Sequence, residues 1–185
     1  TIGGTVLLAL IWRMFAGADG YVRDSAASLF IIGYIPLLAS FVGLILAQEH
    51  GVAKVVAVFL CITGSDTGGY AAGATLGRHP MAPNISPKKT WEGMAGSVVL
   101  ASAVSIAMSV LVLHQPWWFG LLLAVVVVIT GTAGDLIESL IKRDVGIKDM
   151  SSFLPGHGGV MDRLDSTLVA APAAWVVFTL MGITW

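Results

Sequence analysis

The sequence predicts an all-α fold, a polytopic bundle of transmembrane helices with polar loops at one end. Of its 185 residues, 56 % are hydrophobic and 11 % are charged, less than half of the roughly 25 % charged residues of a soluble domain. Four segments are apolar over about the length that an α-helix needs to cross a bilayer. Because backbone groups in lipid need partners within their own segment, helices are expected there. The segments are residues 29–47, 94–113, 119–133 and 168–183.

Two further spans are expected from shorter apolar segments, residues 1–14 and 52–62. The second of them continues into a small-residue stretch that places Asp66 at membrane depth. Since the chain starts at Thr1 without an initiator Met, we interpret the first as the end of a longer helix. We expect one transmembrane domain over residues 1–185 with about six spans.

The basic residues predict the orientation of the bundle. If the six spans alternate in direction, nine of the ten Lys and Arg residues fall on one side and only Lys54 on the other. The positive-inside rule assigns the basic side to the cytoplasm, which indicates an integral protein of the inner or plasma membrane. The net charge of −1 predicts no nucleic-acid partner. The single Cys61 excludes an intrachain disulfide and is expected to be a packing residue.

The first polar stretch, residues 84–93, precedes a predicted helix. Pro87 favours an extended Ser86, and the helix is expected to open at Thr90. Lys88 and Lys89 would then lie at a helix N-terminus, where backbone N–H groups and the helix dipole attract anions. The alternative is a membrane anchor with an N-cap, in which the lysines supply only positive charge.

The second polar stretch, residues 134–143, ends a predicted helix. Asp135, Glu138 and Lys142 share one face, and Glu138 and Lys142 could form a simple i,i+4 pair. Asp135 lies at the edge of the hydrocarbon and has no basic residue four positions later. It therefore needs a cation, and a metal ion is a good candidate.

The third polar stretch runs from Lys148 to Asp165. Its glycines, at positions 156, 158 and 159, allow the backbone to approach a bound group closely. Asp162 and Asp165 are expected at the start of a helix, where helix capping explains Asp165 as well as metal binding does. Metal binding is the better explanation for Asp162. Carboxylate ligands suit a hard cation such as Mg²⁺, whereas His157 alone is weak evidence for zinc.

Together these residues resemble the signature of the phosphatidate cytidylyltransferase (CDP-diacylglycerol synthase) family. The resemblance extends upstream to residues 65–68 and 86–93, so it covers roughly residues 65–165. There are two departures: Ala74 stands where family members often carry a basic residue, and the family has further N-terminal helices that are missing here. The resemblance therefore implies that this chain is a C-terminal fragment of a longer protein. The signature residues are Ser139, Lys142, Arg143, Lys148, Asp149, Pro155, Gly156, His157, Gly158, Gly159, Asp162, Arg163 and Asp165.

The resemblance implies Mg²⁺-dependent transfer of a cytidylyl group from CTP to phosphatidic acid, giving CDP-diacylglycerol and pyrophosphate, by an active site in the cytoplasmic polar loops. The implied partners are these substrates and membrane lipid, and a homodimer is left open. The main metal ligands would be Asp135 and Asp162, with Asp66 and Asp165 secondary. Phosphates would be neutralised by Lys88, Lys89, Lys142, Arg143, Lys148 and Arg163, and contacted by His157, Ser86, Thr90 and Ser139.

Other functions remain as alternatives at this point. A CTP-using lipid kinase would also bring nucleotide and metal to a membrane. A CDP-alcohol phosphotransferase is excluded, because its Asp-Gly-x-x-Ala-Arg pattern is broken after Asp19-Gly20. An ion-coupled transporter using Asp66 and Asp135 would place its charges at mid-depth in repeated halves. Here the charges gather at one face, which favours chemistry on a lipid headgroup.

Overall fold

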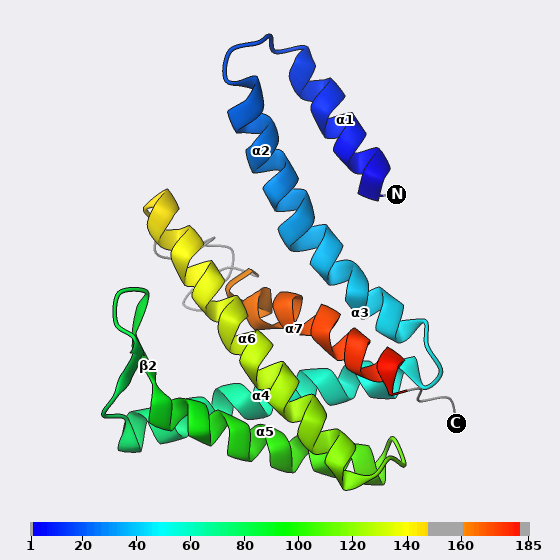
Figure 1. Cartoon of the computed structure of the whole chain (residues 1–185), viewed down its shortest axis with the longest axis vertical. Helices are drawn as coiled ribbons and strands as arrows, with labels where there is room; N and C mark the ends of the chain where they lie inside the picture. The colour runs from blue at the N-terminus through cyan, green and yellow to red at the C-terminus, as the bar shows by residue number, and fades with distance from the viewer. Residues whose placement is uncertain (1, 148–160, 182–185) are drawn as a thin grey trace.

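The computed structural model describes residues 2–147 and 161–181 of the chain. Within these ranges the fold consists of apolar helices and one short β-hairpin (Figure 1). The π-helical segment Gly33–Leu37 joins two of the helices and contains Pro36, which lacks the N–H that a regular helix would use. The elements are α1 (Ile2–Met14), α2 (Tyr21–Ile32), α3 (Leu38–Leu46), α4 (Gly51–Leu76), β1 (Pro80–Ala82), β2 (Ser86–Thr90), α5 (Trp91–Leu111), α6 (Trp117–Val145) and α7 (Met161–Leu180).

Four helical stretches are long and apolar enough to cross a membrane, namely α2 through α3, α4, α5 and α6. Two shorter helices, Ile2–Met14 and Leu164–Leu180, are also apolar. The prediction of a polytopic helical bundle is confirmed, and the protein is an integral membrane protein. Helix α6 continues past the apolar segment to Val145, so the second polar stretch lies at the end of this helix, as predicted.

The core lies among α4, α5, α6 and α7. Helices α4 and α5 approach closely because both carry glycine at their contact, and a Cβ on Gly68 would collide with the backbone of Gly96. Small residues at helix contacts are the usual way to gain packing energy in lipid, where no hydrophobic force draws helices together. Cys61 is fully buried in this core beside Ala101, so its predicted packing role is confirmed.

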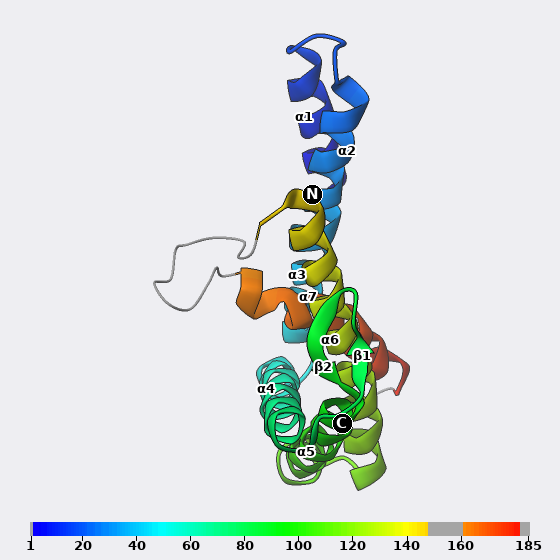
Figure 2. The same ribbon diagram turned by 90° about the vertical axis from the view of Figure 1, so that its left-hand side faces the viewer.

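Helices α1 and α2 extend away from this core as an arm (Figures 1 and 2). Their turn is held by Arg13, which forms an ion pair with Asp24 at 2.9 Å. At the other end of the arm, α3 joins the core through an edge-to-face contact between Phe41 and Trp175 of α7. The arm therefore lies outside the packed body that contains the polar stretches.

The β-hairpin was not predicted as a pair of strands, although the extended Ser86 was. Strands β1 and β2 are antiparallel, with Pro80 opposite Thr90, and the hairpin stands in front of α6 in Figure 2. Its base is fixed by Glu92, whose Oε2 accepts hydrogen bonds from the backbone N–H groups of Arg78 (3.1 Å) and His79 (3.2 Å). The other oxygen of Glu92 contacts His79 Nδ1 at 2.5 Å. The hairpin is thus tied to the first turn of α5.

The polar ends of the elements gather on one side of the molecule. The α1–α2 turn, the hairpin and the end of α6 lie toward the top and left of Figure 1. The α3–α4 and α5–α6 connections and the end of α7 lie toward the lower right. The helices therefore alternate in direction, as was assumed when the basic residues were counted on each side of the membrane.

Candidate active site

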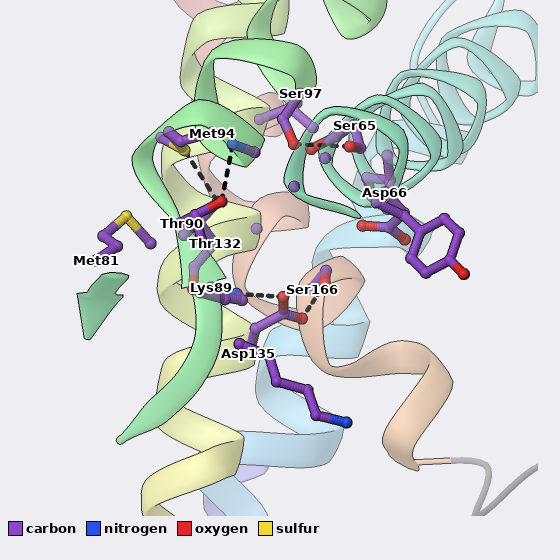
Figure 3. A pocket seen from close by; sticks show the side chains of 18 residues that line it. Ser65, Asp66, Met81, Lys89, Thr90, Met94, Ser97, Thr132, Asp135 and Ser166 are labelled. Atoms are coloured by element: carbon purple, nitrogen blue, oxygen red, sulfur yellow. Dashed lines mark hydrogen bonds and ion pairs between the residues drawn. The ribbon is translucent and has the colours of Figure 1, made fainter. Parts of the chain in front are cut away.

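A cavity of about 250 Å³ opens among α4, α5, α6, α7 and β2 (Figure 3). One part of its wall is polar and charged, and another is formed by apolar side chains such as Ile62 and Val127. A pocket with both kinds of wall suits a ligand that is partly polar and partly apolar. Its polar lining is Ser65, Asp66, Tyr70, Lys88, Lys89, Thr90, Ser97, Thr132, Asp135 and Ser166.

Asp135 is the centre of the polar wall. The ammonium group of Lys89 forms an ion pair with its Oδ2 and also donates to the backbone oxygen of Thr132 at 3.4 Å. The hydroxyl of Ser166 donates to its Oδ1 at 2.7 Å (Figure 3). The cation that Asp135 was predicted to need is therefore supplied within the chain by Lys89 of β2, 46 residues earlier, where local spacing gives no indication of it.

Two further carboxylates lie behind Asp135. Asp165 is 9 % exposed and Glu138 is 3 % exposed. Lys142 binds Glu138 Oε2 at 2.9 Å, so the predicted i,i+4 pair is confirmed. Within the described part of the chain, Glu138 Oε1 has no hydrogen-bond partner although it is buried. Carboxylate oxygens are the donor type that a hard cation such as Mg²⁺ prefers.

The position of Asp165 also decides one of the alternatives left by the sequence. Helix α7 begins at Met161, so Asp165 lies in its second turn and does not cap the helix. Its Oδ1 instead accepts from the backbone N–H of Ser166 at 2.6 Å. The capping explanation for Asp165 was wrong. The predicted helix start at residues 162–165 is confirmed.

Next to Asp135, the cavity wall carries positive charge at a helix N-terminus. Thr90 caps α5, since its Oγ1 accepts from the backbone N–H of Gly93 at 3.1 Å, as predicted. Lys88 and Lys89 precede this cap and line the cavity. A pure membrane anchor would not need lysines that face a polar cavity, so the geometry favours anion binding there. Asp66 lines the cavity from α4, and Figure 3 shows it on the far side from Lys89.

Glycines allow the walls to come together at this point. A Cβ on Gly134 of α6 would lie 2.6 Å from the backbone oxygen of Asp165 and 3.2 Å from the Cα of Ser166. On the other side, the hydroxyl of Ser97 donates to the backbone oxygen of Ser65 at 2.7 Å and links α5 to α4. The sequence thus positions charged side chains by letting backbones approach closely.

The remaining predicted site residues do not line the cavity or lie outside the described residues. Ser86 and Ser139 are half-buried but are not among the described residues that line the cavity. Arg143 is exposed on α6. Lys148 and His157 lie outside the described residues, as do the side chains of Asp162 and Arg163. Among the side chains that are described, no group of three acidic, His or Cys residues has metal-binding geometry.

Sequence reasoning missed Ser166, Thr132 and the cavity-lining Tyr70 and Met81. Ser166 could have been predicted as a site residue, because it directly follows the last signature residue, Asp165, and carries a hydroxyl group near the start of an apolar helix. Thr132 contributes only a backbone oxygen to Lys89, which no side-chain pattern reveals. Tyr70 and Met81 give no local signal, since their place in the cavity depends on how α4 and β1 pack.

The fold and the cavity define a class: an integral membrane protein with a paired-charge site at one end of its helix bundle. Residues 1–181 match the model of the cytidylyltransferase family. The chain belongs to this family.

Named relatives agree with this assignment. The chain is similar to the phosphatidate cytidylyltransferases of Mycobacterium bovis (44 % identity; 97 % of this chain, 63 % of that protein) and Mycobacterium leprae (42 % identity; 97 % and 62 %). It is also similar to the phosphatidate cytidylyltransferase of Pseudomonas aeruginosa, at 37 % identity over 92 % of this chain and 67 % of that protein. The chain spans about three fifths of the length of the mycobacterial relatives.

Proposed function

We propose that this chain carries the active site of an enzyme that transfers a cytidylyl group from CTP to phosphatidic acid, giving CDP-diacylglycerol and pyrophosphate. The observation that carries the proposal is the cavity in which Lys88 and Lys89 face Asp135 and Asp66. Such a site can hold phosphates and a cation together at the end of membrane helices. The relatives named phosphatidate cytidylyltransferase support the same assignment.

The reaction is a displacement at the α-phosphorus of CTP. A phosphate oxygen of phosphatidate forms the new bond, the bond from the α-phosphorus to the bridging oxygen breaks, and pyrophosphate leaves with that electron pair. A phosphomonoester has its second pKa near 6, so phosphatidate is largely a dianion at neutral pH and hardly needs a general base. The main barrier is repulsion between two anions, which fixed cations reduce.

The residues of this chain divide this task between them. Asp135 and Asp162 are proposed as the main ligands of Mg²⁺, with Asp66 and Asp165 secondary. A bound Mg²⁺ supplies charge neutralisation and alignment of phosphate oxygens. Lys88, Lys89 and Thr90 are proposed to hold phosphate at the start of α5. The other phosphate contacts are proposed for Ser86, Ser139, Lys142, Arg143, Lys148, His157 and Arg163.

The proposal is tested with the full-length protein in liposomes that contain phosphatidic acid. We expect radiolabel from CTP to appear in lipid, one pyrophosphate to be released per CDP-diacylglycerol, and both to require Mg²⁺ and phosphatidic acid. Transfer of a terminal phosphate from CTP to a lipid alcohol would favour a lipid kinase instead. Ion-coupled solute flux without any nucleotide chemistry would favour the transporter.

The cytoplasmic orientation of the site is a separate proposal, supported by the nine-to-one distribution of basic residues. Single cysteines at Ser152 and Gln115, in a Cys61→Ala background, should react with impermeant reagents from opposite sides of the membrane. Gln115 lies in the turn before α6 and should label from outside intact cells. Labelling of the cysteine at position 152 from outside would place the site away from cytoplasmic CTP and contradict the orientation.

A further inference from the structure

Ser166 lies at the point where α7 meets the charged wall of the cavity. Its side chain is buried, at 6 % exposure, and its hydroxyl donates to Asp135 Oδ1 at 2.7 Å. The same hydroxyl lies 3.3 Å from Asp165 Oδ1. Ser166 is therefore the group that stands between two carboxylates from two different helices.

The single hydroxyl proton cannot serve both carboxylates equally. The shorter distance is to Asp135, and Asp165 Oδ1 already accepts the backbone N–H of Ser166 at 2.6 Å. The hydroxyl is thus directed to Asp135. With Lys89 on Oδ2, both oxygens of Asp135 have a partner, so the carboxylate is fixed in rotation by contacts from α7 and β2.

The close approach of the helices makes this contact specific. Gly134 leaves space for the backbone of Asp165 and Ser166, and a Cβ on Gly131 would lie 3.6 Å from the Cβ of Ser166. A side chain at Gly134 would push α7 outward and break the 2.7 Å contact, whereas the spacing at Gly131 is that of an ordinary van der Waals contact. Asp162 precedes Ser166 by four residues, one turn earlier in α7, so the contact also sets the position of that turn relative to Asp135.

We propose that Ser166 is a positioning residue that orients Asp135 for metal binding; the inference rests on the proposed function, in which Asp135 is a metal ligand. Hydrogen bonds from neighbouring groups orient metal-binding carboxylates, and losing one typically changes metal affinity by 10- to 100-fold. The hydroxyl of Ser166 acts on Asp135 and not on the substrates. Its loss should weaken metal binding while the chemical step at saturating metal changes little.

The test measures metal binding separately from catalysis in the full-length protein in detergent. Mn²⁺ binding without nucleotide, followed by the EPR signal of free Mn²⁺, should weaken about tenfold in Ser166→Ala. The Mg²⁺ concentration for half-maximal cytidylyl transfer should rise by a similar factor, with the rate at saturating Mg²⁺ within about threefold of wild type. Ser166→Thr keeps the hydroxyl and should stay within about twofold in both measurements.

Ser109→Ala is the matched control, because Ser109 is a fully buried serine of α5 whose hydroxyl has no partner among the described residues. It should match wild type. The inference is overturned if Ser166→Ala binds Mn²⁺ with wild-type affinity, if Ser166→Thr is as impaired as Ser166→Ala, or if the wild-type protein binds no Mn²⁺. If binding depends on Ser166 but no cytidylyl transfer occurs, the inference holds and the proposed function fails.

Discussion

Two lysines at opposite ends of the bundle show how the same side chain serves two purposes. Lys89 faces the cavity, is 24 % exposed and pairs with the carboxylate of Asp135. Lys54, in the first turn of α4, is 2 % exposed. Its ammonium donates to the neutral amide of Gln48 at 3.1 Å and lies 5.6 Å from the ring centre of Phe178.

The two lysines differ in the charge of their partners and in their exposure to the cavity. Lys89 has an anionic partner at an open cavity, so a phosphate that enters can compete for its charge. Lys54 is buried, its direct contacts are with the neutral Gln48 and Phe178, and it lies about 18 Å from Asp66 along α4, at 1.5 Å per residue. We therefore expect changes near Lys89 to alter catalysis and changes at Lys54 to alter folding alone.

The largest effect is expected at the carboxylate that Lys89 binds. Asp135→Asn keeps the shape of the side chain but removes the charge that would hold a metal. Loss of one such ligand usually costs several kcal/mol of transition-state stabilisation, or about a thousandfold in rate. Asp162→Asn should lose a similar amount. The measurement is the rate of cytidylyl transfer at saturating Mg²⁺.

Asp144→Asn is the matched control for this experiment. Asp144 is an exposed aspartate near the end of the same helix, α6, and has no role in the proposed site. Its rate should equal that of wild type. Near-normal turnover in Asp135→Asn would mean that the ion pair with Lys89 is only structural, and the comparison with Lys54 would lose its basis.

A smaller but clear effect is expected at Lys89 itself. Lys89→Gln should lower kcat/KM for CTP or for phosphatidate by about 10- to 150-fold, which corresponds to the roughly 1.5–3 kcal/mol of a charged hydrogen bond. Separate kinetics against the two substrates show which phosphate it contacts. The same variant should bind Mn²⁺ at least as tightly as wild type without nucleotide, because Asp135 loses the cation that competes with the metal.

The anchor hypothesis makes the opposite prediction for this lysine. As an anchor, Lys89→Arg would be silent and Lys89→Gln would mainly reduce membrane insertion. As a phosphate contact, Lys89 also depends on geometry, because ammonium and guanidinium groups present their donors differently. Insertion and rates should also be measured for Lys88→Gln, the same substitution at the neighbouring lysine. Wild-type rates at low CTP per inserted molecule in both Gln variants would show that this stretch makes no phosphate contact and would leave anchoring as its role.

The hairpin that carries Lys89 offers an intermediate test. Glu92→Gln removes the charge from the contact with His79 and weakens the acceptor for two backbone N–H groups. Loss of hydrogen bonds of this kind typically costs about 0.5–1.5 kcal/mol, so kcat/KM should fall about 2- to 12-fold. Hydrogen exchange of residues 78–90 should become faster. Glu49→Gln, an exposed glutamate at the Lys54 end, should change neither.

These contacts show which parts of the site the sequence could predict. Interactions within one turn of a helix follow from spacing, and the Thr90 cap and the Glu138–Lys142 pair were both predicted. The Lys89–Asp135 pair was not, because the residues are 46 positions apart and meet only when the hairpin folds onto α6. Ser166 reaches Asp135 only because Gly134 lets α7 approach. Hydropathy predicts which segments are helices, but it cannot tell which helix ends will meet.

The smallest catalytic effect is expected at Lys54. Two substitutions there separate the effect of its charge from the effect of its aliphatic side chain. Met has a similar length and fills the same space beside Phe178 without a buried charge, so Lys54→Met should keep or raise the thermal stability. Lys54→Ala leaves a cavity, and losses of this size typically cost about 2–4 kcal/mol of stability. Turnover per folded molecule should stay within about twofold of wild type in both. A tenfold loss of turnover in a stably folded Lys54→Met protein would show that this end of the bundle also takes part in catalysis, and the division between the two lysines would be wrong.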